Sequence, residues 1–141
     1  MRRTRYAVLV ALWGAAVSSA VTAAEHGPAG MKLEHPGDTA LSQDGSGHWV
    51  YKSFPALTRL YVRDGDGPSA SRCSEGCASA WPPLLATHDK VGEKVGDWAV
   101  IARDDGRQQW AYKGRPVYTR FHDLDEDAQS LATEGFHELE P

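Results

Sequence analysis

The sequence has few cysteines and no hydrophobic run long enough to cross a membrane. Cys73 and Cys77 are the only two cysteines among 141 residues, which excludes a scaffold held together by many disulfides. The most apolar stretch covers residues 6–17, whereas a helix needs about 20 apolar residues to span a bilayer. Polar and small residues follow at once, so we do not expect an anchor that spans the membrane.

The sequence also lacks a basic cluster and the common catalytic motifs. It has 15 Lys and Arg against 19 Asp and Glu, a net charge of −4. A nucleic-acid binder must neutralise phosphates with a basic face, so we exclude that class. Neither Gly-x-Ser-x-Gly, His-Glu-x-x-His nor a glycine-rich phosphate loop occurs. We therefore expect no enzymatic activity.

The first residues have the order of an export signal. Arg2, Arg3 and Arg5 form a positive segment, the apolar residues 6–17 come next, and small residues follow. We predict that residues 1–23 are a signal peptide cleaved after Ala23, or one residue later. The mature protein would then lie in the periplasm or be secreted.

Cleavage would leave an acidic chain without a lipid anchor. It removes three Arg and no acidic residue, leaving 12 basic and 19 acidic side chains, a net charge of −7 over 118 residues. Cys73 is the first cysteine, so no cysteine stands at the new N-terminus to carry a lipid. The length suits a single domain with one modest core. Its charge is compatible with basic partners.

The mature chain divides into a lead-in and a β-rich domain. Residues 24–46 are rich in Gly, Pro, Ser, Asp and His, which predicts a flexible lead-in. Residues 47–141 contain short runs of alternating apolar and polar residues between turn signals, as in half-buried strands. The predicted strands cover residues 48–52, 58–63, 98–103, 108–112 and 116–121. We therefore predict a mainly β fold, a small antiparallel domain.

Two turns and one helix complete this prediction. Asp105-Gly106 favours a tight hairpin because Gly adopts the positive φ that such turns need. Lys113-Gly114-Arg115 predicts a second hairpin and thus a three-stranded meander over residues 98–121. Residues 71–81 predict one short helix that carries the Cys pair, with Ser71 as N-cap and Pro82 preventing its continuation.

The two β regions resemble each other in sequence. Residues 49–55 match residues 110–116, and residues 61–66 match residues 118–123. Both copies keep the order Trp, Tyr, Lys, Pro, Tyr, Arg, Asp, which chance similarity does not readily produce. We predict two hairpin-like pseudo-repeats that share one core, because neither copy buries its aromatic face alone.

Several of these motifs together resemble a known family. The similar residues are Tyr61, Asp66, the Cys73 to Cys77 block with Trp81, Pro82 and Pro83, the run Trp110, Tyr112, Gly114, Pro116 and Tyr118, then Asp123 and the closing 135–137. They resemble bacterial secreted-repeat proteins, predicted lipoproteins with a Tyr-x-(Phe, Trp or Tyr)-x-x-Asp motif. The resemblance implies a β-rich envelope or secreted module and assigns no reaction. Here the central aromatic position of the motif is Arg63 in one copy and Arg120 in the other.

The cysteine pair allows two interpretations. After export the two thiols meet an oxidising compartment, and at helical spacing their Cα atoms lie about 6 Å apart, which a disulfide tolerates. A structural disulfide between Cys73 and Cys77 is our first prediction. The alternative is a reduced pair that binds copper together with an imidazole, since soft thiolates suit that metal. The candidate imidazoles are those of His88, His122 and His137.

Acidic residues near the end of the chain suggest a further metal site. Asp123, Asp125, Asp127 and Glu134 have the spacing of a calcium loop. Ala128 stands where the sharp turn of such a loop has Gly, so we favour a solvated acidic loop.

Aromatic residues at alternating positions predict the core. They are Trp49, Tyr51, Tyr61, Trp98, Trp110, Tyr112 and Tyr118. One or two of them could instead line a ligand groove, and Arg63 and Arg120 could stack on aromatic rings or pair with Asp66 and Asp123. Our first hypothesis is a non-catalytic envelope module without a cofactor that binds a partner protein or small ligand. The alternative is a periplasmic copper or redox protein.

Overall fold

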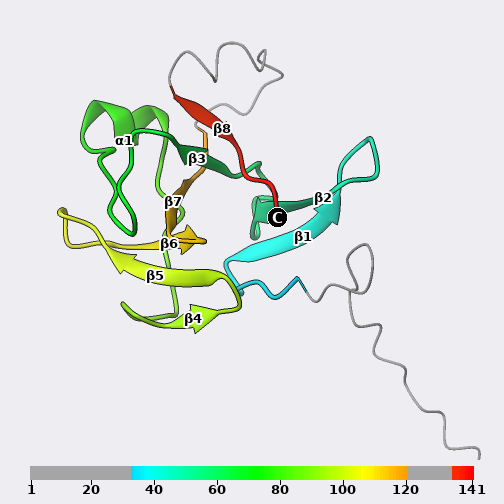
Figure 1. Ribbon diagram of the computed structural model, residues 1–141, viewed down its shortest axis with the longest axis horizontal. Coiled ribbons are helices and arrows are strands. Elements are labelled where there is room, and N and C mark those ends of the chain that lie inside the picture. The colour runs from blue at the N-terminus through cyan, green and yellow to red at the C-terminus, as the bar shows by residue number, and fades with distance from the viewer. Residues whose placement is uncertain (1–32, 121–134) are drawn as a thin grey trace, which may run out of the picture.

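The computed structural model describes residues 33–120 and 135–141, which form two antiparallel sheets and one short helix (Figure 1). The strands are β1 (Thr39–Gln43), β2 (Trp49–Ser53), β3 (Tyr61–Arg63), β4 (Lys94–Val95), β5 (Trp98–Ala102), β6 (Gln108–Tyr112), β7 (Arg115–Tyr118) and β8 (Phe136–Glu138), and the helix is α1 (Gly76–Ala80). The prediction of a mainly β fold is confirmed. The predicted signal peptide lies outside the described residues.

Strands β1 and β2 pair with each other, and the other strands form a sheet in the order β4-β5-β6-β7-β3-β8. The predicted meander is present as β5, β6 and β7. Gly106 has a φ of 81° in the first turn, and Lys113 and Gly114 have φ values of 49° and 77° in the second. Positive φ at both central residues defines the tight turn whose twist matches that of the flanking strands.

The prediction of a flexible lead-in over residues 24–46 is wrong for residues 39–43, which form β1. Leu41 lies opposite Tyr51 in the β1–β2 register and is buried in the main core. Just before β1, the Asp38 carboxylate accepts hydrogen bonds from the Trp110 indole N–H at 2.9 Å and from the Thr87 main-chain N–H at 3.0 Å. These contacts order a segment whose composition alone predicts disorder.

Burial acts to raise the pKa of Asp38, but the hydrogen bonds from Thr87 and Trp110 outweigh it. The pKa therefore lies below the ordinary value of an aspartate. Asp38 is ionised at neutral pH, where a carboxylate is a stronger acceptor than a neutral acid.

The predicted helix over residues 71–81 is also wrong in its extent, because only Gly76–Ala80 is helical. Ser71 is not its N-cap: its hydroxyl instead bonds the Tyr118 hydroxyl at 2.7 Å. The Cys73 carbonyl accepts a hydrogen bond from the Arg103 guanidinium at 2.8 Å. Contacts with the sheet thus hold residues 71–73 outside the helix, and only Cys77 of the pair lies within it.

Aromatic rings fill both clusters of the core. The larger cluster has Tyr51, Trp98, Trp110 and Tyr112 among its members, and the smaller consists of Tyr61, Cys73, Trp81, Tyr118 and Phe136. In the larger cluster the ring centroids of Tyr51 and Tyr112 lie 5.4 Å apart, and each ring contacts Trp98. Six of the seven predicted core aromatics are buried, and Trp49 is half-buried.

The two pseudo-repeats each contribute three strands, but only those of the second copy pair with one another as a meander. Strands β1, β2 and β3 form the first, and β5, β6 and β7 form the second. Tyr51 and Tyr112, which correspond in the sequence repeat, lie opposite Leu41 and Trp98 respectively. The units join where β3 pairs with β7, and there Tyr61 lies opposite Tyr118, its counterpart in the repeat. Because equivalent residues of the two copies lie opposite each other, an approximate twofold axis passes between Tyr61 and Tyr118.

A substitution at Gly96 tests whether residues 33–38 pack against the turn between β4 and β5, as the structure shows. Gly96 has a φ of 57°, and a Cβ added to it would lie 3.0 Å from Cβ of Glu34. We expect Gly96→Ala to lower the free energy of unfolding by about 2 kcal/mol, from the positive φ and the steric contact together. Chemical denaturation measures this.

Gly45→Ala is the matched control, since a Cβ at Gly45 meets nothing within 4 Å. Its effect should stay within about 0.5 kcal/mol. Equal stability of both variants would contradict the docked position of Glu34.

Candidate functional site

The motif tyrosines and aspartates connect the two repeats. The Tyr118 hydroxyl donates to the Asp66 carboxylate at 2.5 Å, and Tyr118 belongs to the second copy whereas Asp66 belongs to the first. Burial first, and then the hydrogen bond to Asp66, raise the pKa of Tyr118 to about 12. Its phenol stays protonated and keeps donating. Asp123, the corresponding motif residue of the second copy, lies outside the described residues.

The two motif arginines enclose a pair of stacked rings. Trp81 and Phe136 stack with centroids 3.9 Å apart and planes 6° apart. The Arg63 guanidinium lies 5.7 Å from the Phe136 centroid, and that of Arg120 lies 4.9 Å from the Trp81 centroid. Each arginine thus occupies the position that the resemblance assigns to an aromatic side chain and makes a cation–π contact there. Arg63 also lies 4.0 Å from Asp66.

A disulfide joins Cys73 to Cys77, with a Cα–Cα distance of 5.2 Å. Cys73 is buried against Trp81 and Phe136, so the disulfide belongs to the smaller core cluster. Copper binding would need both sulfurs as thiolates, because the thiolate is the metal ligand. The copper interpretation therefore stays a prediction for the reduced chain.

The candidate imidazoles lie in different surroundings. Nδ1 of His88 contacts the Thr87 hydroxyl at 2.7 Å, and Nδ1 of His137 lies 3.5 Å from the Asp64 carboxylate. His122 and the predicted calcium ligands Asp123, Asp125, Asp127 and Glu134 lie outside the described residues. Within residues 33–120 and 135–141, no group of three or more His, Cys, Asp and Glu side chains is arranged to hold a metal.

A buried arginine ties the disulfide loop to the sheet. The Arg103 guanidinium donates to Ser71, Gln109 and the Cys73 carbonyl at 2.9, 2.7 and 2.8 Å, and to Asp105 at 3.1 Å. Gln109 in turn donates to the Val117 carbonyl on β7. No sequence pattern indicates this role for Arg103, because nothing in the sequence separates it from the exposed Arg107 on the same turn.

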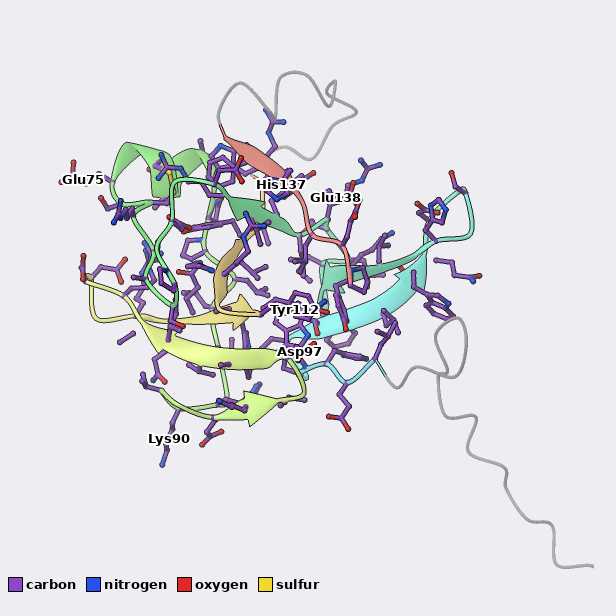
Figure 2. All side chains as sticks on the ribbon, viewed as in Figure 1. Glu75, Lys90, Asp97, Tyr112, His137 and Glu138 are labelled. Atoms are coloured by element: carbon purple, nitrogen blue, oxygen red, sulfur yellow. A yellow bond between two sulfur atoms is a disulfide. The ribbon has the colours of Figure 1, made fainter. Side chains whose placement is uncertain are left out.

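Two hollows lie on either side of the last residues of the chain. The first, of about 360 Å³, is lined by Asp44, His48, Trp49, Val50, Glu138, Leu139, Glu140 and Pro141. The second, of about 340 Å³, is lined by Val62, Tyr112, Lys113, Arg115, His137, Glu138, Leu139 and Glu140. They share residues 138–140, so we treat them as one feature, the C-terminal groove. Figure 2 shows His137 and Glu138 on β8 and Tyr112 at the end of β6.

The groove lies where the two sheets separate. Ser53 at the end of β2 still donates its main-chain N–H to Thr58, but β3 then pairs with β7 and β8 instead of β2. The Leu139 N–H donates to the Leu60 carbonyl at 2.8 Å, which fixes the chain beyond β8. Among the described residues the start of β2 pairs only with β1, and Trp49 lines the first hollow together with residues 138–141.

The charges of the groove differ between its two hollows. The first has three carboxylates, those of Asp44, Glu138 and Glu140, beside the half-buried Trp49. Main-chain hydrogen bonding from His48 is the largest cause that lowers the pKa of Asp44. The second hollow shares both glutamates and adds Lys113, Arg115 and His137, and Arg115 pairs with Asp64 at 3.2 Å. The alternating aromatic residues predict that Trp49 or Tyr112 could line a groove, but no sequence pattern indicates Glu138 and Glu140.

Comparison with known proteins bears on the second copy of the repeat. Residues 99–134 match the model of a family described as a secreted repeat of unknown function. Within these residues the chain is similar to that secreted repeat. The match begins in β5 and includes Tyr118 and Asp123, so it confirms the family resemblance. Neither the curated proteins nor the solved structures contain a match to the chain.

The secreted repeat fits an exported module, and its description assigns no role. No helix in the described part of the chain is long and apolar enough to cross a membrane.

Arg103 provides a test of the buried network. Arg103→Met keeps much of the side-chain volume but leaves the Cys73 carbonyl and the Gln109 amide oxygen without this donor. We expect the free energy of unfolding to fall by about 3 kcal/mol. Urea denaturation measures the change.

Arg107→Met is the control, because Arg107 is exposed and its side chain bonds only Asp105 in the structure. It should leave the unfolding midpoint nearly unchanged. If both variants unfold at the same midpoint, the Arg103 network does not stabilise the secreted repeat.

Proposed function

We propose that the chain is an exported, non-catalytic module that binds a positively charged segment of an envelope partner in the C-terminal groove. The observation that carries the proposal is the first hollow, in which three carboxylates surround a space of about 360 Å³ beside Trp49. Such a space can accept one or two long side chains. A basic segment is the partner whose charge complements this lining.

Both components of the hollow favour cations. Carboxylates attract Lys and Arg side chains, and the face of a Trp ring stabilises a cation that lies over it. The acidic chain would also steer a basic partner toward it and speed the encounter at low ionic strength. The hollow is already formed in the free chain, so binding requires little rearrangement.

The polar residues that bond one another inside the fold support a binding role rather than catalysis. Tyr118 and Asp66 bond each other between the repeats, and Cys73 and Cys77 form a disulfide. Arg103 is engaged by four hydrogen-bond partners inside the fold. These groups stabilise the framework, whereas the groove side chains line a space that a ligand can enter, and there Glu138 also lies 3.9 Å from Arg59.

A titration with defined peptides tests this proposal. We expect a lysine-rich peptide, added to the mature protein, to shift the NMR signals of the Trp49 indole and of residues 138–140. The double variant Glu138→Gln/Glu140→Gln should weaken binding about fivefold, because each exposed charge contributes modestly.

The control double variant, Glu75→Gln/Asp104→Asn, removes the same charge from exposed sites on α1's N-cap and on the β5–β6 turn. It should bind like the unmodified protein. Equal weakening by both double variants, or equal binding of a glutamate-rich peptide, would contradict a specific site in the groove.

A further inference from the structure

The turn that follows β2 exposes four consecutive apolar residues. Phe54, Pro55, Ala56 and Leu57 are all exposed, and Phe54 and Leu57 show 58% and 54% of their surface. None of the four has a polar side chain. We call residues 54–57 the apolar tip. An exposed apolar group of this kind marks an interaction site when it is contiguous.

The chain on both sides holds the apolar tip in a fixed shape. Ser53 donates its main-chain N–H to the Thr58 carbonyl at 2.9 Å, and the two hydroxyls of these residues lie 2.6 Å apart. Leu57 has a φ of 56°, in the left-handed region that residues other than Gly rarely adopt. The turn therefore holds Leu57 in this conformation while its side chain stays exposed.

The backbone of the apolar tip is suited to an apolar environment. The Phe54 N–H donates to the Asp38 carbonyl and the Leu57 N–H to the Ser53 carbonyl, both at 2.9 Å, and Pro55 has no N–H. Three of the four residues therefore bring no unbonded N–H donor to the tip. In hydrocarbon an unbonded N–H costs several kcal/mol, so this arrangement removes most of that cost.

Two basic residues lie at the base of the apolar tip. Lys52 and Arg59 are bridge partners across the turn. Arg59 is half-exposed and also lies 3.9 Å from the Glu138 carboxylate. An apolar projection above two cations matches the layers of a phospholipid surface, where phosphates lie outside the hydrocarbon.

We propose that the apolar tip inserts into the interfacial region of a phospholipid bilayer, with Lys52 and Arg59 near the lipid phosphates. A bilayer accepts a convex apolar projection without a preformed pocket. The net negative charge of the chain opposes approach to an anionic surface, so binding is weak and reversible. This proposal does not depend on a ligand in the C-terminal groove.

Co-sedimentation with vesicles of phosphatidylcholine containing a minor share of phosphatidylglycerol tests the proposal, using the mature protein. We expect the protein to sediment with the vesicles and Phe54→Ser to lower its partition coefficient about tenfold. Val91→Ser is the matched control, because Val91 is a large apolar residue that is 55% exposed elsewhere. It should partition like the unmodified protein.

Leu57→Gly separates membrane binding from folding. Glycine accepts the positive φ of this position, so the melting temperature should stay close to that of the unmodified protein while the partition coefficient falls. No sedimentation with the vesicles, or equal partition of the Phe54, Leu57 and Val91 variants, would overturn the proposal. So would a dimer in protein without vesicles that Phe54→Ser dissociates, which would assign the apolar tip to a second copy of the chain.

Discussion

The structure depends on the contact between two similar repeats across one pair of strands. Neither three-strand unit encloses its own aromatic rings, so the larger core cluster combines Tyr51 of the first copy with Trp98 and Tyr112 of the second. Strands β3 and β7 bring Tyr61 opposite Tyr118 at the centre of this contact. The hydrogen bond from Tyr118 to Asp66 then connects a motif tyrosine of one copy with the motif aspartate of the other. The motif thus connects the two repeats through this hydrogen bond.

Much of this fold could be predicted from local sequence, and the rest depends on contacts between distant residues. The hairpins of β5, β6 and β7 follow from alternation and from glycines at the turns, which are local signals. Strand β1 could not be predicted, because its polar composition gains order only from pairing with β2 and from Asp38 bonding Trp110. The helix was predicted too long for the same reason, since Arg103, 30 residues away, holds the Cys73 carbonyl. Glu138 and Glu140 reach the groove only because β8 pairs with β3.

The residues that hold the fold together are mostly different from those that line the proposed binding surfaces. Among the described residues, those that carry the motif are mostly buried or bonded between the repeats, so in this chain the motif packs the two copies together. The apolar tip and most residues of the groove lie outside the motif, although the motif residue Tyr112 also lines the second hollow. A shared framework with separate surface residues allows one fold to serve different partners. Arg63 and Arg120 stand at the central position of the motif and lie over Phe136 and Trp81, so in this chain cation–π contacts fill that position.

Native-state hydrogen exchange tests the central claim that the two copies form one cooperative unit. The Leu139 N–H donates to the Leu60 carbonyl, and the Asp64 N–H donates to the Gly135 carbonyl. Because main-chain groups alternate in direction along a strand, the N–H and C=O of Tyr61 point away from β8 and toward β7. The account predicts that the amides of Tyr61 and Tyr118 are among the slowest to exchange. Their opening free energies should be equal and should match the free energy of global unfolding. Exchange of the Tyr61 amide at a distinctly lower free energy, while the Tyr118 amide stays protected, would show that the first copy opens on its own and would contradict the account.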